Sequence, residues 1–115
     1  MERYNVILSI EARADIREIV RYIAKELQEP STAERMLDRI EETIGSLESM
    51  PEKYAVVSDE YLASCGIRMA AVKKHLIFYT INHSENEVNI VRVLYGKRNW
   101  IDLLTEKRKA GFKEL

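Results

Sequence analysis

Three β-prone runs in the second half of the chain limit its possible fold more than any other feature. They cover residues 66–72, 75–81 and 88–95. The first gap between them is the dipeptide Lys73-Lys74, and the second is the polar stretch 82–86. Because a crossover needs a dozen or more residues, gaps this short predict tight turns and an antiparallel meander.

The first half of the chain has the spacing of two amphipathic helices. One apolar stripe ends near Gln28 and has Ser9 as its expected N-cap. Pro30 then breaks the chain, and Ser31 with Glu34 fits a capping box for a second helix. The two stripes consist of Ala12, Ile16, Ile19, Val20, Ile23 and Leu27, and of Met36, Leu37, Ile40, Ile44 and Leu47. Two helices joined by so few residues predict an antiparallel hairpin.

These elements predict an α+β fold in the order β-α-α-β-β-β, beginning with a strand at residues 4–9. The helical hairpin is expected to pack on one face of a small antiparallel sheet. Residues 52–65 show no periodicity and are expected to form an irregular connector. After Trp100, apolar residues predict a short C-terminal helix, and residues 105–115 are expected to form a charged tail.

The composition narrows the class of protein. At 115 residues we expect one domain, residues 1–115, with its core in 4–104. The chain is 46% hydrophobic and 32% charged, as in ordinary soluble proteins, and it has no apolar run of membrane-spanning length. Its N-terminus lacks the apolar core of a signal peptide, so we expect a cytoplasmic location. Cys65 is single, and His75 and His83 lack metal-ligand spacing, so we expect no disulfide, metal or cofactor.

Charge is distributed unevenly along the chain. Residues 1–65 carry a balance of −6 and residues 66–115 a balance of +5, which together give a net charge of −1. A basic half can meet nucleic acid, an acidic protein or the acidic half of its own fold. A protein whose main task is to grip RNA is expected to be clearly basic, so the near-neutral total counts against RNA chemistry.

Short motifs follow one another in a fixed order along most of the chain. The early ones are Ser9 with Ala12, Asp15-Ile16, Ile19, Tyr22-Ile23, Pro30 with Ala33, and Leu47 before Pro51. The later ones are Gly66-Ile67-Arg68, Ile77-Phe78-Tyr79 and the run from Arg92 to Trp100. In this order the motifs, which span residues 4–104, resemble the ParE/RelE superfamily of bacterial toxins from type II toxin–antitoxin modules. The resemblance implies a RelE/ParE-like fold.

The superfamily contains two activities. ParE-like members poison DNA gyrase and are not known as nucleases, whereas RelE-like members are mRNA interferases that cleave messenger RNA on the ribosome. The resemblance therefore implies a growth-inhibiting toxin that acts on DNA gyrase, or alternatively on the ribosome and its mRNA. A third interpretation is an inactive relic that only binds an antitoxin. All three imply a cognate antitoxin as partner, in a toxin–antitoxin hetero-oligomer.

A RelE-like nuclease needs a base, cations around the scissile phosphate, and an acid for the leaving oxygen. The resemblance makes four residues the catalytic candidates for this activity: Arg68, Lys74, His75 and Arg98. Alternation places His75 and Leu76 on opposite strand faces, so His75 does not simply replace the arginine of RelE-like members. Their late aromatic acid is also missing, because Leu103 and Leu104 occupy that region. This partial set favours a ParE-like protein that is not an enzyme.

Target or antitoxin contacts are expected from basic and aromatic residues in the later motifs. The candidates are Arg68, Arg92, Tyr95, Lys97, Arg98 and Trp100. Several of them also have a structural interpretation. Arg92 is expected to share a strand face with Ile90 and Leu94 and to pair with a helix carboxylate, since a charge on a packed face is costly unless paired. Tyr95 is expected to pack with a polar tip, and Trp100 to close one end of the core.

The remaining cations keep two interpretations each. Arg68 fits a contact with the target or antitoxin, or it has a structural role as a solvated strand residue or in an ion pair with the acidic helices. Lys97 and Arg98 follow Gly96 at the end of a strand, where backbone donors and cations can hold an anion, but a solvated turn explains them equally well.

Overall fold

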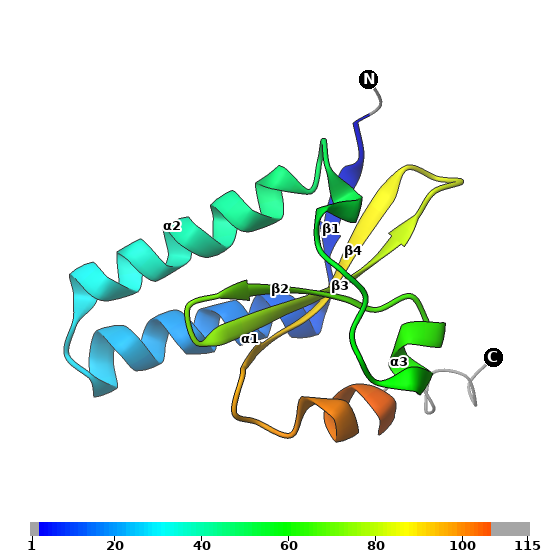
Figure 1. Cartoon of the computed structure of the whole chain (residues 1–115). Helices are drawn as coiled ribbons and strands as arrows, with labels where there is room; N and C mark the ends of the chain where they lie inside the picture. The colour runs from blue at the N-terminus through cyan, green and yellow to red at the C-terminus, as the bar shows by residue number, and fades with distance from the viewer. Residues whose placement is uncertain (1–2, 107–115) are drawn as a thin grey trace.

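The computed structural model of the chain describes residues 3–106 (Figure 1). The elements are β1 (Asn5–Leu8), α1 (Ile10–Arg21), the π-helical turn η1 (Tyr22–Glu26), α2 (Pro30–Ser46), the 3-10 turn η2 (Pro51–Lys53), α3 (Glu60–Ser64), β2 (Arg68–Val72), β3 (His75–Asn82) and β4 (Glu87–Tyr95). A C-terminal helix covers residues 100–106. None of the helices in this part of the chain is long and apolar enough to cross a membrane.

The four strands form one sheet in the order β1-β4-β3-β2. Strands β2, β3 and β4 pair antiparallel, which confirms the predicted meander. The turn between β2 and β3 lies at Lys73, whose φ of 56° places it in the left-handed region typical of tight turns. β1 pairs with β4 in parallel, which the long connection through residues 9–86 permits. The sheet is therefore antiparallel except at this one edge.

The helical hairpin is confirmed, with one correction at its middle. The Ser9 Oγ accepts a hydrogen bond from the Ala12 N–H at 2.9 Å and so caps α1 as predicted. α2, however, begins at Pro30 with Glu29 as its N-cap, so the predicted Ser31 capping box is wrong. Proline is favoured in the first helical position because the N–H that it lacks has no intrahelical partner there. Ser31 therefore lies inside the first turn instead of before it.

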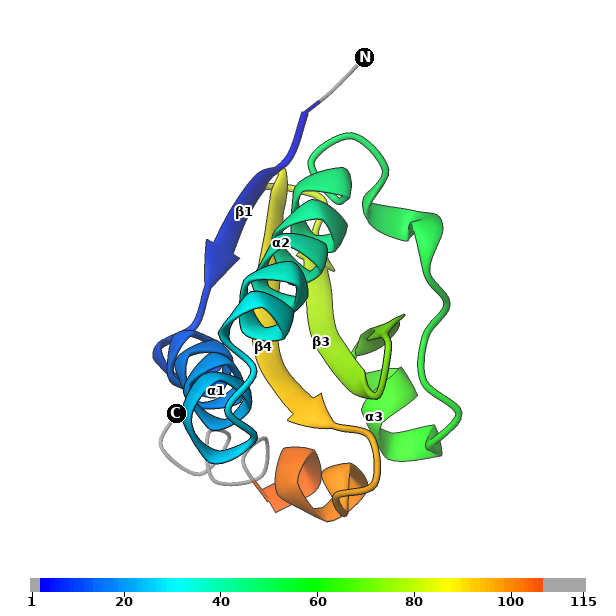
Figure 2. The same ribbon diagram turned by 90° about the vertical axis from the view of Figure 1, so that its left-hand side faces the viewer.

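Apolar side chains cover both faces of the sheet. On one face, α1 and α2 pack on the sheet around buried residues such as Ile40, Tyr79 and Ile90, as predicted (Figure 2). On the opposite face, a second cluster gathers Leu62 from α3 and Leu104 from the C-terminal helix, with four further buried residues, Val57, Ile67, Phe78 and Leu94. The expected one-sided packing is therefore only part of the core.

The prediction of an irregular connector at residues 52–65 is wrong in part, because α3 lies within it. The Asp59 carboxylate caps this helix by accepting the Leu62 N–H at 3.0 Å. The short helix buries Leu62 against the second face of the sheet, which explains why the segment is ordered. At the other end of the chain, residues 105 and 106 belong to the C-terminal helix, and the rest of the predicted tail lies outside the described residues.

β4 contains one residue more than the facing part of β3. Tyr79 pairs with Ile90 and Phe78 with Arg92, so Val91 has no partner in β3. The extra residue places Ile90 in the cluster under the helices and Leu94 in the cluster on the opposite face. The prediction that Arg92 shares one face with both Ile90 and Leu94 is therefore wrong.

Candidate functional site

Arg92 is bound by a carboxylate of α1. Its Nε and Nη2 donate hydrogen bonds to the two carboxylate oxygens of Asp15 at 2.7 and 2.8 Å. The Asp15 Oδ2 also accepts the backbone N–H of Val93 at 2.9 Å. The two side chains are only 19% and 12% exposed, and the hydrogen bond to Asp15 raises the pKa of Arg92. The predicted pairing with a helix carboxylate is confirmed, and this contact fixes α1 on β4.

Arg68 also forms hydrogen bonds within the fold, but its partners are backbone carbonyl groups. Its Nη1 donates to the Tyr54 carbonyl oxygen at 2.7 Å and to that of Glu52 at 3.5 Å. The neighbouring Tyr79 hydroxyl donates to the Pro51 carbonyl oxygen at 2.8 Å, and burial raises the pKa of this hydroxyl. Arg68 and Tyr79 thus hold the segment that leaves α2. The predicted ion pair of Arg68 with the acidic helices is not formed within the described residues, and its predicted contact with a target or antitoxin stays a prediction.

The strand register separates Arg68 from the other nuclease candidates. Arg68 pairs with Tyr79, whereas Val72, at the other end of β2, pairs with His75. Four residues along a strand correspond to roughly 13 Å. Lys74 and His75 therefore lie together at the turn between β2 and β3, and Arg68 lies at the opposite end of that strand pair.

His75 lies beside Tyr95 on the helix side of the sheet. The two residues pair across β3 and β4, with ring centroids 5.7 Å apart. The His75 Nδ1 is buried without a hydrogen-bond partner in the described structure, and burial lowers the pKa of the imidazole. Leu76 contributes to the cluster on the opposite face, which confirms the predicted alternation. His75 is therefore a mostly neutral aromatic side chain at neutral pH.

A hollow of about 670 Å³ opens beside His75, and we call it the tip hollow because it lies at the tip of the helical hairpin. Its lining includes Ile19, Tyr22, Ile23, Leu27, Met36, Lys73, Lys74, His75 and Tyr95. Three of the predicted site residues, Lys74, His75 and Tyr95, meet here. The hairpin residues of the hollow were missed, because only the docking of the helices brings them to this strand end.

The loop after β4 brings two further cations next to the tip hollow. The Gly96 N–H donates to the Lys74 carbonyl oxygen at 2.8 Å, which joins this loop to the turn between β2 and β3. A Cβ at position 96 would lie 3.2 Å from that oxygen, so glycine permits the close approach. Lys97 and Arg98 follow directly, and both are exposed. The structure thus gathers Lys74, Lys97 and Arg98 at one end of the sheet.

Trp100 packs on the opposite face of the sheet. Its ring lies 5.0 Å from the ring of Phe78, centroid to centroid, within the second apolar cluster. This confirms that Trp100 closes one end of the core. Its position separates it from Tyr95 and His75, which face the helices.

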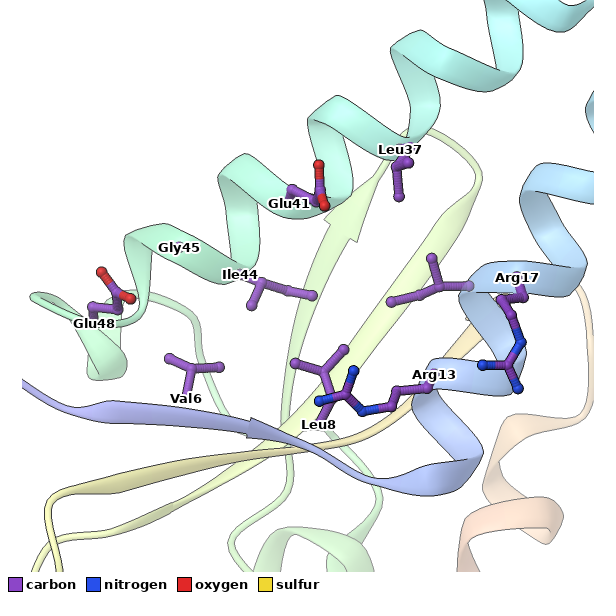
Figure 3. Close-up of a pocket in the computed structure, with 10 residues that line it drawn as sticks. Val6, Leu8, Arg13, Arg17, Leu37, Glu41, Ile44, Gly45 and Glu48 are labelled. Atoms are coloured by element: carbon purple, nitrogen blue, oxygen red, sulfur yellow. The ribbon is translucent and has the colours of Figure 1, made fainter.

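A second hollow, which we call the helix groove, lies between β1, α1 and α2 (Figure 3). It has a volume of about 470 Å³ and an apolar floor that includes Val6, Leu8 and Ile44. Its charged residues differ in sign from wall to wall, with Arg13 and Arg17 on α1 and Glu41 on α2. Glu48, just after the end of α2, also lines the groove and forms an ion pair with Arg3 at 3.0 Å. The only sequence signal for it was the pair of apolar stripes, because the groove itself depends on the spacing of the helices. The arrangement suits an amphipathic segment with charges on both flanks.

Within residues 3–106, no group of three or more histidine, cysteine, aspartate or glutamate side chains is arranged to hold a metal ion. Cys65 is a free thiol of intermediate exposure.

The comparisons with known proteins point to toxins. The model of one protein family, described as the ParE toxin of the type II toxin–antitoxin system parDE, matches residues 6–100. No curated protein matches the chain. Several solved structures do match the chain. One of them is the chromosomal ParDE toxin–antitoxin system from P. aeruginosa. The two sequences are 18% identical, the match covers 81% of this chain and 96% of that chain, and the TM-score is 0.66.

Two further solved structures that match are complexes of RelE-type toxins with their antitoxins. The RelBE2 toxin–antitoxin complex from Mycobacterium tuberculosis gives 24% identity, coverage of 81% of this chain and 98% of that chain, and a TM-score of 0.60. The archaeal RelE–RelB complex from Pyrococcus horikoshii gives 17% identity, coverage of 84% and 98%, and a TM-score of 0.57. At such identities the likenesses establish the ParE/RelE-like fold that the motifs predicted.

Proposed function

This chain belongs to the ParE toxin family of type II toxin–antitoxin systems, and we propose that it inhibits growth by binding its target without cleaving it. The family resemblance makes DNA gyrase the target. The observation that supports binding over RNA cleavage is the separation of the nuclease candidates, since Arg68 is bound to carbonyl oxygens at the far end of β2 from His75.

The chemistry of RNA cleavage explains why the separation of Arg68 from His75 disfavours a nuclease. A base, an acid and the cations that hold the phosphate must all lie within hydrogen-bond reach of one scissile group. Arg68 lies roughly 13 Å along the sheet from Lys74 and His75, and its guanidinium already has partners. By the resemblance, Leu103 and Leu104 stand in the region where RelE-like members carry an aromatic acid. Within residues 3–106, Arg68 therefore lies apart from Lys74, His75 and the loop with Arg98, and the four candidates do not surround one point.

We further propose that a cognate antitoxin neutralises the toxin by covering the helix groove, as a toxin–antitoxin hetero-oligomer. The solved relatives are named as toxin–antitoxin systems and complexes. The apolar floor suits an amphipathic antitoxin segment, and the opposite charges of the walls orient it. Acidic antitoxin residues would meet Arg13 and Arg17, and basic ones would meet Glu41.

A RelE-like mRNA interferase, acting on the ribosome, is the second candidate, and one observation favours it. His75, whose pKa is lowered by burial, lies next to Lys74 and close to the loop that carries Lys97 and Arg98. A neutral imidazole can accept the proton of a 2′-hydroxyl, and the cations can hold the phosphate. This arrangement would work without Arg68.

The two candidates are distinguished by pulse labelling of cells that express the chain without an antitoxin. Incorporation of labelled thymidine and labelled methionine is followed over minutes. We expect DNA synthesis to fall first while translation continues, because a poisoned gyrase blocks replication before protein synthesis.

An early fall in translation, with cleaved messages, would instead support the interferase. In that case His75→Ala should abolish the cleavage, and the matched exposed-histidine variant His83→Ala should retain it. Normal growth and normal incorporation of both labels would contradict both activities and leave the inactive relic.

A further inference from the structure

The tip hollow has an apolar interior that the fold leaves partly open. Tyr22 and Leu27, from the end of the helical hairpin, are 51% and 48% exposed although they line a hollow of about 670 Å³. Ile19 and Met36 extend the same lining. This volume is in the range of small-molecule and side-chain pockets. A large apolar side chain from outside would remove the exposed surface from water.

The backbone around the hollow is unusual at the same place. Residues Tyr22–Glu26 form a π-helical turn, in which the Leu27 N–H donates to the Tyr22 carbonyl oxygen at 3.1 Å. Such turns are rare and frequently lie at functional sites. Tyr22 and Ile23 of this turn line the hollow, so the local backbone departs from a regular helix at the wall of the hollow.

The rim of the hollow is positively charged and unpaired. Lys73 and Lys74 line it, and the loop with Lys97 and Arg98 is held against the same turn. In the part of the chain that the structure describes, none of these four cations forms an ion pair. Glu18 also lines the hollow, but Arg21 holds it at 2.6 Å. The open charge at this rim therefore favours an anionic partner.

We propose that the tip hollow binds an acidic protein segment, which inserts one large apolar side chain between the hairpin tip and the end of the meander. The segment's carboxylates meet the lysine rim. A nucleic acid fits less well, because its bases would leave the aliphatic side chains of Ile19, Ile23 and Leu27 in the hollow without an apolar partner. The chain's own residues 107–115 also fit poorly, since Lys107, Arg108, Lys109 and Lys113 would be repelled by the rim. This surface is separate from the helix groove, and the inference goes beyond the proposed function.

The test is a titration of the isotope-labelled full chain with the peptide acetyl-Glu-Asp-Leu-Trp-Asp-Glu-amide, followed by amide chemical shifts. At about 1 mM peptide, an affinity typical of a weak single-anchor contact is detectable. We expect shifts centred on Tyr22, Leu27, His75 and Tyr95. A control peptide with lysine in place of every acid should bind at least about tenfold more weakly.

Matched variants locate the contact. The double variant Tyr22→Ala with Leu27→Ser should weaken binding about tenfold, whereas Ile10→Ser, at an apolar residue 82% exposed at the start of α1, should not. Lys74→Gln with Lys97→Gln should reduce both the affinity and its dependence on salt, and Lys53→Gln should leave both unchanged. Unchanged melting curves show that the variants are folded.

Four outcomes would overturn the proposal. They are the absence of shifts, shifts centred on the helix groove, equal binding of the basic peptide, and a preference for an oligouridylate over the acidic peptide. A concentration-dependent dimer with shifts at the hollow would assign it to a second copy of the chain instead. Because these readouts use purified protein and not growth, they succeed or fail independently of the gyrase proposal.

Discussion

Arg92 and the two cations of the loop after β4 are close in sequence but differ completely in their surroundings. Arg92 is mostly buried, and Asp15 accepts two hydrogen bonds from it. Lys97 and Arg98 follow a few residues later, are exposed, and form no ion pair in the described structure. A charge that is buried against a partner contributes to the fold, whereas an exposed and unpaired charge remains available to a ligand. Basic character alone therefore does not identify a binding residue.

The largest expected effect comes from breaking the Asp15 contact. Asp15→Ala leaves the guanidinium of Arg92 mostly buried without its partner and removes the acceptor of the Val93 N–H. We expect a loss of about 3 kcal/mol in the free energy of unfolding, measured by urea denaturation. The exposed ion pair between Glu18 and Arg21 provides the control. Glu18→Gln should leave the unfolding midpoint unchanged.

A double variant sharpens this result. Asp15→Ala with Arg92→Met no longer buries an unpaired charge, so it should recover part of the lost stability. If the single and double variants both unfold at the wild-type midpoint, the contact does not stabilise the fold, and Arg92 returns to the set of possible ligand contacts.

A smaller effect is expected at His75. Burial lowers the pKa of its imidazole below the usual 6.5, so the unfolded chain binds a proton more readily than the folded one. Stability should therefore be lost as the pH falls from about 6.5 toward the lowered pKa. Urea denaturation across this range should show a flatter pH dependence for His75→Phe, whereas His83→Gln should retain the wild-type loss. An unaltered profile in His75→Phe would show that the imidazole is not desolvated.

The smallest effect on stability is expected at the rim. Lys74→Gln with Lys97→Gln should change the free energy of unfolding by no more than about 0.5 kcal/mol, because neither side chain has a partner within residues 3–106. The same variant is expected to weaken peptide binding. A clear loss of stability would show that these lysines stabilise the folded chain, as Arg92 does, and are not free for a ligand.

Local signals made much of the fold predictable from the sequence. The N-cap at Ser9 depends on neighbours within three residues, and the meander depends on two short gaps. The extra residue Val91 and the helix α3 left no such signal, because both are stabilised by contacts with distant strands. Pro30 and Ser31 gave competing helix starts, and the proline determined the outcome.

The candidate site was less predictable, because its parts meet only after folding. The sequence indicated that Arg92 needs a carboxylate, but not that Asp15 supplies it. The partners of Arg68 are backbone carbonyl oxygens in an irregular segment, which residue types cannot reveal. The tip hollow joins residues of η1 with the turn between β2 and β3, and no spacing in the sequence connects them.

The contact of Asp15 with Val93 also bears on aggregation. β1 pairs with β4 only as far as Ile90, so the next part of β4 would present unpaired backbone groups on one side. An exposed strand edge of this kind is a template for pairing with another chain. Ser9 donates its hydroxyl to the Val91 carbonyl oxygen at 2.8 Å, and Asp15 accepts the Val93 N–H at 2.9 Å. The N-cap of α1 and one side chain of its second turn thus complete the edge that a four-residue strand leaves open, and they protect the sheet from growing into an intermolecular one.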